Sequence, residues 1–247
     1  MSWNTTRQLL FALGIFVVIV GAGVGGYFSF FYTAPSCEDR IKNGTEEGVD
    51  CGGSCARICV QPNITTVWAR SVRVAPGVYH AVALIKNPQT DAVGTVPYTV
   101  SLFDRNNILI ATREGALRIL PGETAPLFEA NIVTGERIPV KTFVDIGTGT
   151  FTRKNRTASA VRVASFTVDE ERGRVVAQLE NRSLFPVSDV TVTALVYDTN
   201  NVAQYASQTF VERLGIREQK EVVFTWQEPF TVGPVHVDII TRITDGT

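Results

Sequence analysis

The sequence predicts a mainly β protein with an N-terminal transmembrane helix, a short disulfide-rich module and two tandem β-sandwiches. Three observations lead to this fold class. Residues 9–32 carry no charge, all four cysteines fall within residues 37–59, and from residue 62 onward apolar and polar residues alternate in a pattern that occurs twice. A net charge of −1 over 247 residues lacks the charge excess typical of nucleic-acid-binding proteins.

The uncharged run over residues 9–32 predicts a helix that spans a lipid bilayer. At about 1.5 Å per residue it would be about 36 Å long, which exceeds a bilayer core of about 30 Å. In hydrocarbon the backbone must satisfy its own hydrogen bonds, and this favours a helix in spite of the clustered glycines. Tyr27 and Tyr32 are expected at the distal interface, and Trp3 at the near one.

Charge favours a cytoplasmic amino terminus. Arg7 and the α-amino group precede the run, whereas the basic residues that follow it are farther away. Residues 1–8 are then a cytoplasmic tail, and the remainder of the chain after the span is extracytoplasmic. Two alternatives stay open. Val20-Gly21-Ala22 resembles a signal-peptide cleavage site, although the apolar run continues past it. Gly21 and Gly25 have the spacing of a helix-pairing motif.

The predicted module, residues 33–61, holds every cysteine of the chain. It is rich in glycine and has only three larger aliphatic residues between its first and last cysteines, so it cannot build a core and needs cross-links. Outside the cytoplasm two disulfides are expected, with three possible pairings. In the chain-entropy model, a bridge that closes a loop of about 15 residues contributes about 3 kcal/mol. The predicted half-cystines are Cys37, Cys51, Cys55 and Cys59.

Metal sites are the rival interpretations of this module. A zinc site with four cysteine ligands is disfavoured because the short spacings are C-x3-C rather than the C-x2-C of zinc knuckles. The module also offers oxygen donors that could hold calcium, but their spacing fits no known loop, so solvated turn residues are expected. These donors are Asp39, Asn43, Glu46, Glu47 and Asp50.

The segment from Cys37 to Cys55 resembles a cysteine-rich module that recurs in secreted and surface proteins, often beside β-sandwich repeats. The shared pattern is C-x-D-x-I-x-N-G-x-E-x-G-V-D-C-G-G-x-C, and it covers about a tenth of the chain. The resemblance implies an exposed extracytoplasmic location and no activity. The matching residues are Cys37, Asp39, Ile41, Asn43, Gly44, Glu46, Gly48, Val49, Asp50, Cys51, Gly52, Gly53 and Cys55.

An internal repeat predicts two domains of similar size, residues 62–152 and 158–247. Matching residues keep a constant separation of 94 positions, and the string VALIKN corresponds to VAQLEN. The offset persists over almost forty residues, which favours duplication over coincidence. The recurring residues are Ala83, Asn87, Asp104, Asn106, Asn107 and Leu120, matched by Ala177, Asn181, Asp198, Asn200, Asn201 and Leu214.

Alternation within each copy predicts strands of a sandwich with about seven strands. In the second copy Val190, Val192, Ala194 and Val196 share one face, and Thr191, Thr193, Leu195 and Tyr197 share the other. Asp198-Thr199-Asn200-Asn201 predicts a hairpin turn, as does Asp104-Arg105-Asn106-Asn107, because Asn and Asp tolerate left-handed backbone. Leu120-Pro121-Gly122-Glu123 predicts a further turn.

The second copy resembles the FxLYD-type domains and the broader immunoglobulin-like and transthyretin-like sandwiches of bacterial envelope proteins. The strings GRVVAQLENRS and DVTVTALVYDTNN carry the likeness, and the first copy departs from it by having Phe103 in place of Tyr197. The resemblance implies an extracytoplasmic immunoglobulin-like sandwich and supplies no catalytic residues. It falls on Asn181, Leu195, Tyr197 and Asp198, and less fully on Asn87, Leu102 and Asp104.

The predicted linker, residues 152–159, contains Arg153, Lys154 and Arg156 and is expected to be a solvated hinge. His80 and His236 are the only histidines, and each lies in a strand-like segment, so strand-surface roles are expected. Trp68 and Trp226 are expected to pack in the core or between strands. Glycosylation sequons begin at Asn43, Asn63, Asn155 and Asn181, and a further one at Asn4 would lie inside; the sequence leaves their use open.

The expected function is a structural or binding role, such as adhesion or surface display, by a single-pass extracytoplasmic protein. No catalytic motif is present, so no enzyme activity, cofactor or metal site is expected. Expected partners are the bilayer, through residues 9–32, and other envelope or surface proteins, but not nucleic acid. The alternative is an accessory subunit of a membrane-bound secretion, pilus or sensor complex. The oligomeric state and any ligand stay open.

Overall fold

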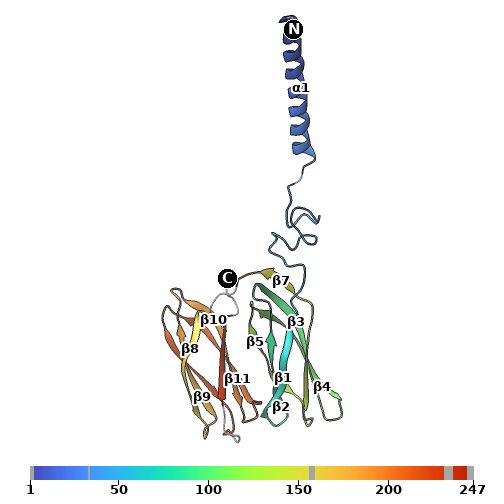
Figure 1. Ribbon diagram of the computed structural model, residues 1–247. Helices are drawn as coiled ribbons and strands as arrows, with labels where there is room; N and C mark the ends of the chain where they lie inside the picture. The colour runs from blue at the N-terminus through green and yellow to red at the C-terminus, as the bar shows by residue number, and fades with distance from the viewer. Residues whose placement is uncertain (1–2, 33, 156–158, 231–235, 244–247) are drawn as a thin grey trace. The chain divides into compact units, whose positions relative to one another are not determined.

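The computed structural model describes residues 3–32, 34–155, 159–230 and 236–243 (Figure 1). The chain forms two compact units, Met1–Cys55 and Ala56–Thr247, which are described separately. The first unit contains an apolar helix and most of the cysteine module. The second unit contains all the β-strands found in the described residues.

Helix α1 (Trp3–Phe30) begins six residues before the predicted span and ends two residues before its predicted end. Within the described residues it is the one helix long and apolar enough to cross a membrane, over Arg7–Phe30. Its large apolar side chains are exposed on all sides, among them Leu10, Phe11 and Val18. A helix that is apolar all round needs a surrounding that is not water, such as lipid or other protein.

The second unit consists of antiparallel strands in four sheets. The first seven strands are β1 (Thr65–Ala75), β2 (Val78–Lys86), β3 (Ala92–Phe103), β4 (Leu109–Ile119), β5 (Thr124–Val133), β6 (Lys141–Ile146) and β7 (Thr150–Arg153). The following strands are β8 (Val161–Asp169), β9 (Arg174–Asn181), β10 (Val187–Tyr197), β11 (Ala203–Leu214), β12 (Gln219–Thr225) and β13 (His236–Ile243).

The strands form two sandwiches with the same pairing. In the first, sheet β1-β2-β5 faces sheet β4-β3-β6, and β7 pairs with β3. In the second, sheet β12-β9-β8 faces sheet β11-β10-β13. Each pairing among β8–β13 therefore has its counterpart among β1–β6. The predicted fold class is confirmed.

Each sandwich has its own apolar core. Strand β9 shows the reason, since Val175, Ala177 and Leu179 are fully buried and the residues between them are only half-buried. Val190, Val192 and Ala194 of β10 meet them from the opposite sheet. Burial of one side chain in two therefore produces the alternation seen in the sequence. The first core is built in the same way from Ala81, Ala83, Ile85, Val96, Val100, Leu102, Leu117, Ile119, Ala125, Leu127, Ile132 and Phe151.

The hairpin turns have the backbone that their sequences predict. Asn107 and Asn201 adopt φ values of 60° and 59° after β3 and β10. Asp198 Oδ1 accepts the backbone N–H groups of Asn200 and Val202, at 2.8 and 3.0 Å. Asp104 makes the equivalent bonds in the first sandwich.

The connection between the sandwiches differs from the prediction at its beginning. Thr152 and Arg153 belong to β7, which pairs with the start of β3, so the linker begins later. Lys154 N–H also donates to Asp91 O, at 2.8 Å, which extends the contact by one residue. Arg156 and the predicted start of the second sandwich at residue 158 lie outside the described residues.

Residues 56–61, grouped by the prediction with the cysteine module, lie in the second unit. Arg57 forms a bridge with Thr152, and Ile58 N–H donates to Phe151 O, at 3.2 Å. The Gln61 side-chain amide donates to the backbone carbonyl oxygen of Gly149 and accepts the backbone N–H of the same residue. These contacts fix the start of the unit to β7 of the first sandwich.

Candidate functional site

The cysteine module is cross-linked. A disulfide joins Cys37 to Cys55, and their Cα atoms are 5.7 Å apart. Cys51 and Cys59 are also disulfide-bonded, and no described cysteine is free. Because a metal-binding cysteine must be a thiolate, the oxidised module offers no sulfur ligand for zinc.

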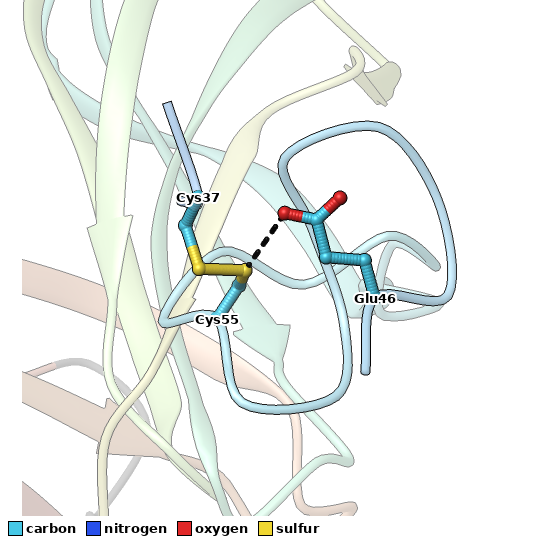
Figure 2. Close-up of side chains that lie close together, drawn as sticks. All are labelled: Cys37, Glu46 and Cys55. Carbon is cyan, nitrogen blue, oxygen red and sulfur yellow. Dashed lines mark hydrogen bonds between the residues drawn. A yellow bond between two sulfur atoms is a disulfide. The ribbon is translucent and has the colours of Figure 1, made fainter. Parts of the chain in front are cut away.

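The Glu46 carboxylate is turned toward the Cys37–Cys55 bridge (Figure 2). Its Oε1 lies 3.4 Å from Cys55 Sγ, and its Oε2 accepts the backbone N–H groups of Asn43 and Asp50, both at 3.3 Å. The sulfurs are bonded to each other and are not thiolates, so Cys37, Glu46 and Cys55 do not form a metal-ligand set in this state. Glu46 instead holds the loop against the bridge.

Asp39 and Asp50 of the module also bond to its backbone. Asp50 accepts the N–H of Arg40, at 3.0 Å, and Asp39 accepts that of Ile41, at 2.9 Å. The Asn43 amide donates to Asp39 Oδ2, at 2.7 Å, and this bond, followed by that from Ile41, holds the pKa of Asp39 below its usual range. Three of the carboxylates considered as calcium donors, Asp39, Glu46 and Asp50, therefore have a structural use, which is to cap backbone N–H groups.

The glycines of the Cys-Gly-Gly-x-Cys string are needed for close approach. Gly53 has a φ of +55°, and a Cβ there would lie 1.9 Å from the carbonyl oxygen of Thr45. Gly52 has a φ of +75° and leaves room for the Glu47 side chain. Left-handed backbone without side-chain space requires glycine. The shared pattern thus encodes a compact cross-linked loop.

The two sandwiches meet face to face through a third apolar cluster. The outer face of β1 and β2 packs against the outer face of β10 and β11, and Trp68 meets Tyr197 edge to face with ring centroids 6.3 Å apart. Strand β10 is consequently buried on both faces. The buried members are Val72, Val82, Leu195, Tyr197, Ala203 and Ala206, with Trp68, Leu84, Phe128 and Ile240 half-buried around them.

An ion pair closes this interface at the end where the chain joins the first sandwich. Arg242 Nε of β13 lies 2.7 Å from Glu123 Oε1, and their side chains are only 12% and 17% exposed. Arg242 also donates to the carbonyl oxygen of Arg118. Glu123 Oε2 accepts the N–H of Leu120, at 2.8 Å, so the predicted Leu120–Glu123 turn carries the acidic partner.

A cavity of about 550 Å³ lies beside the interface and has both polar and apolar lining residues. Its lining includes Arg70, Arg73, His80, Gln204 and Glu228. These side chains could contact a polar or charged ligand. The apolar cluster described above brings β1 and β11, which supply most of the lining, next to each other.

Both histidines have structural contacts. His80 Nδ1 accepts the N–H of Asn131, at 3.0 Å, and its ring packs on Phe128. Burial lowers the pKa of His80 and so favours the neutral imidazole. The His236 ring stacks on Tyr197, with centroids 4.3 Å apart. Burial, followed by the nearby Asp238, raises the pKa of the Tyr197 phenol.

The two asparagines that carry the domain resemblance are fully buried. The Asn181 amide donates to the carbonyl oxygens of Phe185 and Gly215, both at 2.8 Å, and Asn87 donates to those of Ala92 and Leu120. Each asparagine therefore ties two loops together at one end of its sandwich. A buried amide is inaccessible to glycosylation enzymes, so the sequon at Asn181 is not a modification site of the folded protein.

Trp68 and Trp226 both pack against other side chains, as expected, but Trp68 packs between the two sandwiches rather than within one. Trp226 follows β12, forms a ring cluster with Tyr205 and Phe230, and donates its indole N–H to Ala206 O, at 3.3 Å. The described residues bring no predicted site residues together apart from the cysteines. The interface was missed because alternation shows only that a second face is apolar, and not what covers it.

No family model matches the chain, and no curated protein matches it. Among solved structures, a red sea bream transglutaminase is similar at 13% identity and a TM-score of 0.23, over 72% of this chain and 29% of that one. The calcium-binding domain CBD12 of CALX1.1 is similar at 12% identity and a TM-score of 0.21, over 68% of this chain and 74% of that one. This chain therefore spans less than a third of the transglutaminase.

Proposed function

We propose that the protein is a single-pass membrane protein whose cysteine module and sandwiches lie outside the cytoplasm, where they bind other envelope or surface proteins. Helix α1 supports the membrane anchor, because its apolar side chains are not buried against other parts of the protein. Without a bilayer they would be exposed to water. The disulfides support the location, because such bonds persist in oxidising compartments.

The observation that carries the proposal is the succession of an apolar helix and a cross-linked module along one short stretch of chain. Phe30 ends the helix, and Cys37 begins the first bridge only seven residues later. A signal peptide would be removed, whereas an anchor would keep the module beside the bilayer. The cytoplasmic amino terminus rests on Arg7 and the α-amino group.

Protease protection tests the orientation. The full chain is expressed with an epitope at its amino terminus. Protease added outside the intact cells should degrade residues 37–247 and leave the epitope protected. A chain that is fully protected in intact cells would contradict an extracytoplasmic location. Release of a chain that lacks residues 1–22 would instead show a cleaved signal peptide.

Binding rather than catalysis is proposed for the sandwiches. Asp39, Glu46, Asp50, His80 and His236 all make structural contacts described above, which supports a scaffold role. Edge strands and loops of sandwiches are common recognition surfaces. We also propose that the two sandwiches are tandem copies of one FxLYD-type domain. The agreement between their strand pairings supports this.

The alternative role is an accessory subunit whose helix makes the essential contacts. Added Cβ atoms at Gly21 and Gly25 would meet nothing within 4 Å, so this face of α1 offers close approach to another helix. Replacing residues 1–32 with an unrelated anchor separates the roles. Retained cellular function favours binding by the sandwiches, and loss of function in a correctly located, folded chain favours the accessory subunit.

A further inference from the structure

The second sandwich carries three exposed apolar side chains at one end, here called the apolar corner. Leu184, Phe185 and Ile216 are 67%, 74% and 57% exposed. They lie on two loops, between β9 and β10 and between β11 and β12, which the buried Asn181 amide joins by donating to Phe185 O and Gly215 O. The apolar corner is therefore held together by a rigid base.

Packing within the protein does not explain these side chains. The residues 94 positions earlier in the first sandwich are Thr90, Asp91 and Gly122, so the matching positions there carry no large apolar side chain. Three large apolar residues on adjacent loops form the kind of patch that marks a binding surface.

Basic residues flank the apolar corner. Arg182 and Arg217 are exposed and lie on the same two loops. The nearby Glu218 carboxylate is engaged by the backbone N–H of Gly215, at 2.5 Å. A basic residue is attracted to an anionic membrane surface, and apolar side chains beside it can enter the interface.

The apolar corner lies at the end of the unit where the chain arrives from the helix. Arg182 N–H donates to Ala160 O next to the linker, and Arg242 of the neighbouring sheet pairs with Glu123. The turn that carries Glu123 bonds to Gln89, close to the β3–β7 pairing. Arg57 pairs with Thr152 at that same place.

The Cys37–Cys55 bridge makes the connection to the bilayer short. Five residues lead from Tyr32 to Cys37, the bridge spans 5.7 Å between Cα atoms, and two residues lead from Cys55 to Arg57. The covalent path from Tyr32 to Arg57 is then at most about 30 Å, whereas the same 25 residues without the bridge could extend over about 85 Å.

We propose that the apolar corner docks on the bilayer that holds the helix, with Leu184, Phe185 and Ile216 in the interface and Arg182 and Arg217 at the lipid headgroups. This rests on the proposed membrane anchor. Docking gives the second sandwich its own attachment, and the short tether raises its effective concentration at the surface. The opposite end of the unit is then presented to partners.

Depth-dependent fluorescence quenching tests the docking. The full chain is reconstituted in vesicles of phosphatidylcholine and phosphatidylglycerol, with and without brominated acyl chains, as wild type, Phe185→Trp and Phe143→Trp. Phe143 is 58% exposed and lies near the opposite end of the first sandwich, beside Phe103, which makes it the matched control. Wild-type emission is subtracted to remove the three native tryptophans.

Bromine should quench the added emission of Phe185→Trp at least about twofold more than that of Phe143→Trp. Equal quenching at the two positions overturns the docking, as does a blue-shifted Phe185→Trp emission that bromine does not quench, because protein would then cover the corner. Flotation of the same vesicles separates the two proposals. A chain that does not float with them contradicts the anchor, whereas a floating chain with equal quenching contradicts only the docking.

Discussion

Trp68 of the first sandwich meets Tyr197 of the second edge to face, with ring centroids 6.3 Å apart and ring planes at 88°. The two residues are 129 positions apart in the sequence. Their contact lies among Val72, Val82 and Leu195, so aromatic and aliphatic groups together exclude water from the interface. The two sandwiches are consequently one unit rather than domains on a flexible hinge.

Trp68→Ala should weaken this unit. The substitution removes a large half-buried side chain and is expected to lower the free energy of unfolding by about 2–3 kcal/mol. Val67→Ala is the matched control on the same strand, at an exposed position, and should change it by less than about 0.5 kcal/mol. Urea unfolding of the full chain in detergent measures both. Equal midpoints for the two variants would contradict the role of Trp68.

The Glu123–Arg242 pair should be energetically coupled. A double-mutant cycle with Glu123→Gln and Arg242→Met is expected to give a coupling energy of about 1–2 kcal/mol, because both groups are shielded from water. Arg162 and Glu180 have the same 2.7 Å separation, but the arginine is 51% exposed. Their cycle should give less than about 1 kcal/mol. Similar coupling in both cycles would mean that burial of the first pair has no energetic effect.

Asn181→Ala should destabilise the second sandwich by about 2–4 kcal/mol, because carbonyl groups that the amide now satisfies would be left without partners. Asn87→Ala should have an effect of similar size in the first sandwich, since its amide bonds two carbonyls in the same manner. Thermal unfolding followed by circular dichroism measures both. A loss below about 0.5 kcal/mol at either position would show that its amide is not a structural anchor.

Acidification should weaken the β10–β11 hairpin through Asp198. Burial alone would raise the pKa of Asp198, but bonds from Val202, Gln204 and Asn200 outweigh it and the pKa is lowered. A pKa lowered on folding stabilises the protein above the unfolded value, near pH 4, and this stabilisation is lost as pH falls through the folded value. The difference in unfolding free energy between wild type and Asp198→Asn should therefore be larger at pH 7 than at pH 3. Equal differences would exclude this carboxylate as the source.

Removing the first bridge should loosen the module and leave the sandwiches intact. Cys37 and Cys55 are 18 positions apart, and opening a loop of about this size costs about 3 kcal/mol in the chain-entropy model. The Cys37→Ser, Cys55→Ser double variant should be cleaved faster by protease between residues 38 and 54, with an unchanged near-ultraviolet spectrum of the sandwiches. Cleavage at the wild-type rate would show that the loop is held by other contacts.

Local sequence patterns are enough to predict most of the fold. Val175, Ala177 and Leu179 occupy every second position because only one face of β9 is buried. The Asp198–Asn201 string specifies the turn after β10 by local hydrogen bonds. The constant sequence offset that relates Asn87 to Asn181 transfers the same strand and turn predictions from one sandwich to the other. Such features depend on neighbours in the sequence, so a single chain is enough to predict them.

Contacts between distant segments were beyond such reasoning. Leu195 and Tyr197 were placed on the second face of their strand, but nothing local indicates that Val72 and Val82 cover them. The pairing of Cys37 with Cys55 also depends on how Glu46 and the glycines fold the loop, and three pairings were possible. The apolar corner was missed because Leu184, Phe185 and Ile216 come together only through the buried Asn181 amide.

The most direct test of the account is the intact mass of the native chain, recovered from the membrane fraction after an alkaline carbonate wash. We predict that the chain stays in the pellet, retains residues 1–32 and has a mass four hydrogens below that of the fully reduced 27.0 kDa polypeptide. Recovery of the chain in the soluble cytoplasmic fraction, with the mass of the reduced form, would contradict both the anchor and the oxidising compartment.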